Sequence, residues 1–205
     1  MAGPPPQSAP AQSKLELRAE ALRRRAEAAR RAGGAASIAV AERAASVLGL
    51  QQHGAAGIIA GYRPLPGELD PWPLMERLAA RGRKLALPRM VGRDRPLAFH
   101  AWAPGAPLVR GAFKVMEPPA EAPKVRPAVV LVPLVAFDGR GHRLGYGAGF
   151  YDRTLAALRA DGGPPVLAVG LAFAAQRVEA VPVEPFDVPL DLVVTERGVV
   201  RGGGP

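Results

Sequence analysis

Apolar residues near the start of the chain recur every three or four positions, which is typical of amphipathic helices. A first helix is expected to begin at Ser13, because Ser13 and Glu16 have capping-box spacing, and to stop before Gly33 and Gly34. A second helix is expected at about residues 35–48. The apolar positions are Leu15, Ala19, Leu22 and Ala26 in the first helix and Ile38, Ala41, Ala45 and Leu48 in the second.

Further along, short apolar runs bounded by glycine or proline predict buried strands. Asp70 before Pro71 predicts the start of a helix to about residue 80, and another helix is expected at 150–160. A hairpin is expected near the end of the chain, and the proline-rich stretch 103–127 is expected to be irregular apart from a short turn at 112–116. The predicted strands cover residues 55–61, 84–87, 97–102, 128–132, 166–171, 192–194 and 199–201, the last two joined by a turn at 196–198.

Strands and helices therefore alternate through most of the chain. This pattern predicts a three-layer αβα fold with a mainly parallel, Rossmann-like sheet and helices on both faces. Residues 1–12 lack any apolar period and are expected to form a disordered tail, residues 13–201 a single domain, and residues 202–205 a flexible C-terminus. Ligands of such sheets bind beyond the carboxyl ends of the strands.

Composition excludes several kinds of site. The 205 residues include no cysteine, so disulfides, thiolate zinc sites and a catalytic thiol are excluded. No apolar run is long enough to cross a bilayer, and the first residues lack the apolar core of a secretory signal. A cytoplasmic protein with no membrane partner is the expectation.

The chain is strongly basic. Lysine and arginine total 27 and aspartate and glutamate total 18, a net charge of +9. Three explanations are open: a nucleic-acid surface, a phosphorylated small ligand, or a compositional bias without function. Aromatic residues make up 5% of the chain, too few for an obvious base-stacking surface. Arg23, Arg24 and Arg25 are expected to lie on a solvated helix surface.

A glycine-rich loop follows the strand at 128–132. Residues 139–149 contain five glycines, whose backbone N–H groups, together with the next helix N-terminus, can form an anion site. Arg143 adds a positive charge beside this loop. The loop is neither a Walker loop, because no Gly-Lys pair exists, nor a dinucleotide fingerprint, because position 150 is phenylalanine. A glycine-rich turn without a ligand is the alternative.

Asp152 lies in the first turn of the helix after this loop. A carboxylate beside phosphates suits Mg²⁺, which is commonly held by one or two carboxylates plus phosphate oxygens. Asp152 could equally be an acidic residue favoured by the helix dipole. The three histidines are scattered and predict no zinc site.

The stretch LVPLVAFDGRGHRLGYGAGFYDRTL, residues 131–155, closely resembles the characteristic motif of the 5-formyltetrahydrofolate cyclo-ligase family. Other segments resemble the family in the same order along the chain. They are Lys14-x-x-Leu17-Arg18, residues 67–70 (GELD), residues 111–118 (GAFKVMEP), and Asp187 with residues 191–196 (DLVVTE). The resemblance covers about residues 13–197.

The resemblance implies that 5-formyltetrahydrofolate and ATP, with Mg²⁺, give 5,10-methenyltetrahydrofolate, ADP and phosphate. An N-formyl oxygen is a poor leaving group. Transfer of the γ-phosphoryl group to it lets N10 of the folate close the ring. Such a reaction needs the formyl oxygen aligned with the γ-phosphorus and the phosphate charge neutralised.

The resemblance also implies roles for individual residues. Arg143 and Tyr151 are the candidate catalytic residues, and Asp152 and Asp187 the candidate Mg²⁺ ligands, with Asp191 as the alternative to Asp187. Lys14 and Arg18, four residues apart on one helix face, are expected to clamp phosphates. The expected ATP contacts are Lys14, Arg18, Arg143, Leu144, Gly145, Tyr146, Gly147, Ala148, Gly149, Phe150 and Tyr151; the expected folate contacts are Arg18, Glu68, Phe113, Tyr146, Gly147, Ala148, Gly149 and Phe150.

Within the motif the chain departs from the family at Ala148, usually glycine, and at Phe150, usually tyrosine. These changes keep open a non-catalytic folate- or nucleotide-binding relative. A basic nucleic-acid-binding protein is the other alternative. The expected partners are ATP and 5-formyltetrahydrofolate, with no specific nucleic acid, and the expected state is a monomer.

Overall fold

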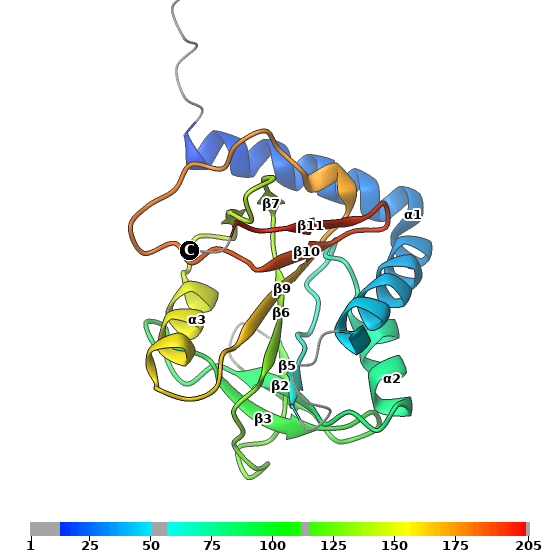
Figure 1. Cartoon of the computed structure of the whole chain (residues 1–205), viewed down its shortest axis with the longest axis vertical. Helices are drawn as coiled ribbons and strands as arrows, with labels where there is room; N and C mark the ends of the chain where they lie inside the picture. The colour runs from blue at the N-terminus through cyan, green and yellow to red at the C-terminus, as the bar shows by residue number, and fades with distance from the viewer. Residues whose placement is uncertain (1–12, 51–56, 112–114, 204–205) are drawn as a thin grey trace, which may run out of the picture.

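The computed structural model describes residues 13–50, 57–111 and 115–203. Its centre is a seven-stranded sheet in the order β11-β10-β9-β6-β1-β2-β3 (Figure 1). The strands of this sheet are β1 (Ile59–Ala60), β2 (Leu85–Arg89), β3 (Ala98–Trp102), β6 (Val129–Pro133), β9 (Leu167–Leu171), β10 (Leu192–Val194) and β11 (Val199–Arg201).

The sheet is mainly parallel, as expected. Four neighbouring pairs run parallel: β1 with β2, β1 with β6, β6 with β9, and β9 with β10. Only the edge strands β3 and β11 pair antiparallel with their neighbours. The parallel strands place several connecting loops at one edge of the sheet, where the glycine-rich loop begins after Pro133.

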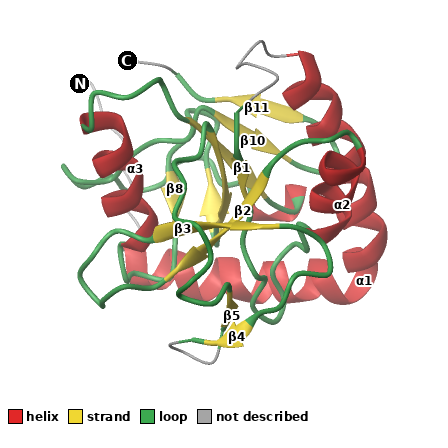
Figure 2. Ribbon diagram, turned by 90° about the horizontal axis from the view of Figure 1, so that it is seen from below, coloured by secondary structure: helices red, strands yellow, loops and turns green. Residues whose placement is uncertain are grey.

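Helices cover both faces of this sheet, so the predicted three-layer fold is confirmed. The helices are α1 (Lys14–Leu50), α2 (Trp72–Ala80) and α3 (Phe150–Ala160), with a short 3₁₀ helix, η2 (Ala174–Gln176). Figures 1 and 2 show α1 and α2 on one side of the strands and α3 on the other. Within the described part of the chain, no helix is long and apolar enough to span a membrane.

Successive side chains of a strand point to opposite faces of the sheet, so the core is divided into two clusters, one on each face. Ile59, Leu131 and Val169 point to the face covered by α1 and α2. Their strand neighbours Val130 and Ala168 pack with Leu155 of α3 on the opposite face. Because both faces are covered, the central strands are apolar throughout, which is why short unbroken apolar runs predicted them correctly.

A third, smaller cluster seats the beginning of α1. Leu17 and Ala21 pack against Val135, Ala136 and Leu144. The last two lie in the small antiparallel pair formed by β7 (Ala136–Phe137) and β8 (Arg143–Leu144), which the sequence did not predict. The cluster therefore brings the basic N-terminal turns of α1 next to the glycine-rich loop.

The predicted ends of the helices agree closely with the structure. The capping box at Ser13 is confirmed, since the backbone N–H of Ser13 donates to Glu16 at 3.0 Å and that of Glu16 donates to Ser13 Oγ at 3.3 Å. The expected break before Gly33 is a single non-helical residue, Ala32, at φ −150°, after which the helix continues. At α2 the carboxylate of Asp70 accepts the N–H of Trp72 at 2.9 Å, and Pro71 is the cap.

One expectation needs correction, and several fall on segments outside the described residues. The irregular stretch 103–127 also contains a second small antiparallel pair, β4 (Val109–Arg110) with β5 (Met116–Glu117). The tail 1–12, the start of the predicted strand at 55–61, most of the turn at 112–116 and the last two residues lie outside the described residues.

Candidate functional site

A buried carboxylate organises the entry to the glycine-rich loop. Asp138 is fully buried and accepts backbone N–H groups from Arg140 at 2.9 Å, His142 at 3.1 Å and Val181 at 3.2 Å. Burial alone would raise its pKa, but these hydrogen bonds outweigh burial and lower the pKa of Asp138. The carboxylate therefore fixes the turn that leads into β8 and ties it to the distant segment at Val181.

The second half of the loop needs glycine for its shape. Gly147 has φ of +97° and Gly149, which caps α3, has φ of +66°. Arg153, one turn into α3, donates to the carbonyl of Ala148 at 2.8 Å, and its guanidinium lies 5.2 Å from the ring centre of Phe150. Arg153 therefore contacts both positions at which the chain departs from the family pattern, Ala148 and Phe150, and supports the loop from the α3 side.

Arg143 and Asp152 form a short ion pair beneath the loop. Arg143 Nη2 donates to Asp152 Oδ1 at 2.7 Å, and its other terminal nitrogen donates to the carbonyl of Val188. Val188 in turn donates its N–H to the same Asp152 oxygen at 3.1 Å. Arg143 is 5% exposed, so its contacts hold Asp152 and the chain at Val188 in place.

Lys14 reaches the same region from the first turn of α1. Its Nζ lies 2.6 Å from Asp187 Oδ2 and 2.9 Å from Glu184 Oε2. Partial burial would lower the pKa of Lys14, but these two carboxylates outweigh burial and raise it. Asp187 is also close enough to Arg143 to act on its charge, so both predicted metal ligands, Asp152 and Asp187, flank this arginine.

Asp191, the alternative to Asp187, has other partners. Its Oδ2 accepts the N–H of Ala168 at 2.7 Å and a guanidinium N–H of Arg159 at 3.0 Å. These contacts fasten the end of α3 to the start of β9 and β10. Of the two candidates, it is Asp187 that contacts Lys14.

Arg18 supports the loop directly. Its Nε donates to the carbonyl of Gly145 at 2.8 Å. Its guanidinium also lies beside Gly147, 3.6 Å from the point where a Cβ would stand. Lys14 and Arg18 therefore lie on the face of α1 that meets the loop, as their spacing predicted.

Glu68 lies in the turn after β1, and its side chain is only 4% exposed. Its Oε2 accepts the N–H of Leu65 at 2.7 Å, and its carboxylate hydrogen-bonds to Tyr146. Burial raises the pKa of Glu68, although these hydrogen bonds and the charge of Arg25 oppose the shift. The structure thus joins the predicted folate contacts Glu68 and Tyr146.

The two tyrosines of the motif differ in surroundings. Tyr146 is 46% exposed and its hydroxyl accepts from Arg25 Nη2 at 2.5 Å. Tyr151 packs against the α3 side of the core, where burial, followed by the charge of Glu68, raises its pKa well above the usual value. Tyr151 therefore stays protonated at neutral pH and can act as a hydrogen-bond donor.

The expectation that Arg25 lies on the helix surface is wrong. Arg25 is 4% exposed, and its Nη1 lies 3.7 Å from Glu68 Oε1. A signal was present, because Arg25 follows Arg18 by seven residues, about two turns of helix, and so shares its face. Arg153 was also missed, and the predicted folate contact Phe113 lies outside the described residues.

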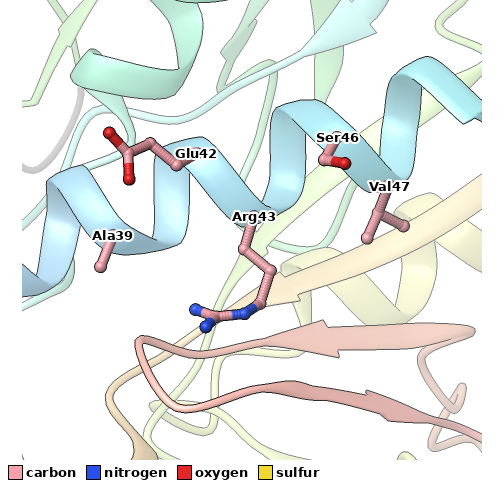
Figure 3. Close-up of a pocket in the computed structure, with 5 residues that line it drawn as sticks. All are labelled: Ala39, Glu42, Arg43, Ser46 and Val47. Carbon is pink, nitrogen blue, oxygen red and sulfur yellow. The ribbon is translucent and has the colours of Figure 1, made fainter.

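One surface hollow lies away from this site. It is lined by the α1 residues Ala39, Glu42, Arg43, Ser46 and Val47, none of which is a predicted site residue. In Figure 3 Arg43 points from α1 toward the β10–β11 turn, where it donates to the carbonyls of Thr195 at 2.9 Å and Glu196 at 3.0 Å. This arginine joins α1 to the sheet edge, which gives part of the basic surplus a structural role.

Among the residues described, no three carboxylate or histidine side chains gather into a metal-binding cluster. Within the described part of the chain, the hydrogen bonds of Asp152 use Oδ1 and those of Asp187 use Oδ2. Each carboxylate thus has a second oxygen to offer. Two carboxylates with phosphate oxygens are a donor set that fits Mg²⁺.

The fold and this constellation are typical of an α/β enzyme, with a candidate site made of a glycine-rich loop suited to anions, basic residues of one helix and two carboxylates. A buried carboxylate, Glu68, borders the same loop through Tyr146.

The chain belongs to the 5-formyltetrahydrofolate cyclo-ligase family, since the model of that family matches residues 10–196. The 5-formyltetrahydrofolate cyclo-ligase of Escherichia coli is 40% identical over 145 residues, covering 67% of this chain and 76% of that protein. The enzyme of Mycolicibacterium smegmatis is 35% identical over 156 residues, covering 69% and 75%.

Solved structures agree with this assignment. The structure of 5,10-methenyltetrahydrofolate synthetase from Aquifex aeolicus matches with a TM-score of 0.73 and 31% identity over 94% of both chains. That of the Mycoplasma pneumoniae synthetase matches with a TM-score of 0.66 over 90% of this chain and 99% of the other; at 22% identity it supports the fold alone.

Proposed function

We propose that this protein converts 5-formyltetrahydrofolate to 5,10-methenyltetrahydrofolate with ATP as co-substrate. Membership of the cyclo-ligase family and the arrangement of the site support this function. The observation that carries the proposal is the gathering of Lys14, Asp152 and Asp187 at one side of the glycine-rich loop and Glu68 at the other. The reaction needs these two sides, one for phosphates and one for the folate.

On the phosphate side, Lys14 and Arg18 would neutralise ATP charge beside the N–H groups of the loop. Asp152 and Asp187 would hold Mg²⁺, which supplies charge neutralisation at the phosphate oxygens. Lys14 and Asp187 pair with each other at 2.6 Å, so the ammonium group and the carboxylate are held in fixed positions on the side where the nucleotide would bind. Arg143 positions Asp152.

On the folate side, Glu68 would accept the N–H groups of the pterin ring. The partners of Glu68 place it next to Tyr146, and Tyr146 belongs to the same loop as the phosphate-facing residues. The reaction would need the formyl oxygen in line with the γ-phosphorus, and a loop that borders both sides could bring the two substrates together. Tyr151, protonated beside the loop, would donate a hydrogen bond to the group being transferred.

The single-domain organisation, the monomeric state and the cytoplasmic location remain predictions of the sequence. The nucleic-acid alternative depended on net charge alone, and the family assignment favours the ligase over it.

The function is tested by incubating the purified chain with 5-formyltetrahydrofolate and Mg²⁺-ATP and following the absorbance of the methenyl product. We expect product only when ATP is present, with one ADP formed for each methenyl group. Absence of ATP-dependent product at high protein concentration, with folate binding retained, would favour the non-catalytic relative.

Replacing Lys14 with alanine should raise KM for ATP by roughly 10- to 100-fold, the value of a hydrogen bond to a charged group. The reason is that Lys14 meets the phosphate side and has no described contact with Glu68. Initial rates at varied ATP and at varied folate measure this. Lys84→Ala, an exposed lysine at the other end of the sheet, is the control. Equal changes in both KM values would contradict a specific phosphate role.

A further inference from the structure

Arg25 is buried without enough hydrogen-bond partners. It is 4% exposed, yet its Nε and Nη1 have no hydrogen-bond partner among the described residues. Its Nη2 donates to the hydroxyl of Tyr146 at 2.5 Å. A buried charged group with unpaired N–H groups is costly, so this arrangement requires an explanation.

Other arginines of the chain show how the N–H groups of an enclosed guanidinium are normally satisfied. Arg143, equally enclosed at 5% exposed, donates from both terminal nitrogens to Asp152 and Val188. Arg126 donates to Asp161 and to the carbonyls of Leu158 and Pro164. Arg25 differs from both because it is fixed in position but keeps free donors.

The surroundings of Arg25 identify where those donors lie. Nη1 is 3.7 Å from Glu68 Oε1, too far for a hydrogen bond but close enough for a charge interaction. The guanidinium carbon lies 5.3 Å from the ring centre of Tyr146. Donor N–H groups of Arg25 therefore lie beside the acceptor oxygens of Glu68.

A pterin ring carries the complementary row. Along one edge of 5-formyltetrahydrofolate stand the 2-amino group and N3–H, which are donors, and then the 4-oxo oxygen, which is an acceptor. A carboxylate can accept only the first two. An enclosed 4-oxo oxygen without a donor would lose its hydrogen bonds to water, so a second protein group is needed there.

We propose that Arg25 is a second pterin-binding residue, whose free guanidinium N–H groups donate to the 4-oxo oxygen while Glu68 accepts from the 2-amino group and N3. The proposal rests on the proposed folate substrate. The formyl group on N5 is the neighbour of the 4-oxo oxygen, so this contact also fixes the formyl oxygen relative to the loop. The hydroxyl of Tyr146 holds the guanidinium in place by accepting from Nη2.

The test uses two ligands that differ at position 4. Folate carries a 4-oxo group and a hydrogen on N3, whereas 4-amino-4-deoxyfolate carries an amino donor at position 4 and no hydrogen on N3; it keeps the 2-amino group for Glu68 but offers Arg25 no oxygen at position 4. Titration calorimetry should give a roughly 10- to 100-fold weaker affinity of Arg25→Gln for folate and a change of about threefold or less for the 4-amino compound. In turnover, KM for 5-formyltetrahydrofolate should rise while KM for ATP stays constant.

Two further variants keep the test decisive. Arg23→Gln, on the exposed side of the same helix, should behave like the unaltered chain. If Arg25→Gln unfolds in a thermal melt, Arg25→Lys keeps the charge but loses the planar fork and should show a smaller loss confined to folate.

The outcomes separate the two proposals. A loss confined to the 4-oxo ligand supports the role of Arg25. Equal weakening of both ligands would mean that Arg25 acts only by positioning Glu68 and Tyr146, and unchanged affinities would likewise overturn the inference. Failure of the unaltered chain to form product from 5-formyltetrahydrofolate would overturn the proposed function itself.

Discussion

An Asp152→Asn variant should keep its fold and lose more than about 100-fold in kcat/KM for ATP, since even groups that only support a metal ligand typically contribute 10–100-fold. Asparagine retains an oxygen that can accept from Arg143 and Val188, so the contacts of Oδ1 survive. The negative charge that would neutralise Mg²⁺ is lost. Rates measured over a range of Mg²⁺ concentrations should show a higher Mg²⁺ requirement.

Asp191→Asn is a matched control for this change. Asp191 also accepts from one arginine and one backbone N–H, those of Arg159 and Ala168, but it has no described contact with Lys14 or the loop. Its replacement should leave the Mg²⁺ requirement unchanged. An Asp152→Asn variant with full activity and the original Mg²⁺ dependence would remove Asp152 from the metal site.

Replacing Asp138 with alanine should lower the free energy of unfolding by about 3 kcal/mol, because three buried backbone N–H groups lose their acceptor. Urea unfolding monitored by circular dichroism measures this. Asp161→Ala removes an exposed aspartate that pairs with Arg126, and it should have a clearly smaller effect. Equal losses in the two variants would contradict the role of Asp138.

The effect of Asp138 depends on pH in a defined direction. Its folded pKa lies below the ordinary value, so the unfolded chain binds the proton more readily. The stabilisation is therefore complete above about pH 4, the pKa of an unperturbed aspartate. It should disappear as the pH falls through the folded pKa, and the difference between wild type and Asp138→Ala should narrow there.

Most helices and strands were predicted because the sequence signals that identify them lie within a few neighbouring residues. Unbroken apolar runs located the central strands, and Ser13 with Glu16 located the start of α1. The small strand pairs β4–β5 and β7–β8 were not predicted, because strands of two residues are too short to show a hydrophobic period. Their place depends on tertiary contacts, such as the packing of Leu144 against Leu17.

The candidate site was predicted where the motif was continuous and missed where it depended on packing. Lys14, Arg18 and Asp152 lie in recognisable segments. Arg25 was missed because the run of three arginines was assigned to the surface as a whole, although its spacing of seven residues from Arg18 places it on the same helix face. Asp187 and Asp191 lie in the segment between η2 and β10, and their partners depend on how this segment runs past the glycine-rich loop. No sequence pattern predicts that path.

Helix α1 rests on two separate apolar clusters, and this has a consequence for local stability. The turns that carry Lys14 and Arg18 dock through Leu17 and Ala21 onto the small cluster, whereas the helix beyond Ala32 packs on the main core. Amide hydrogen exchange should therefore be faster around residues 14–22 than around 36–48. Substrate binding would slow exchange at the first segment selectively, so nucleotide and folate would order the end of the helix that recognises them.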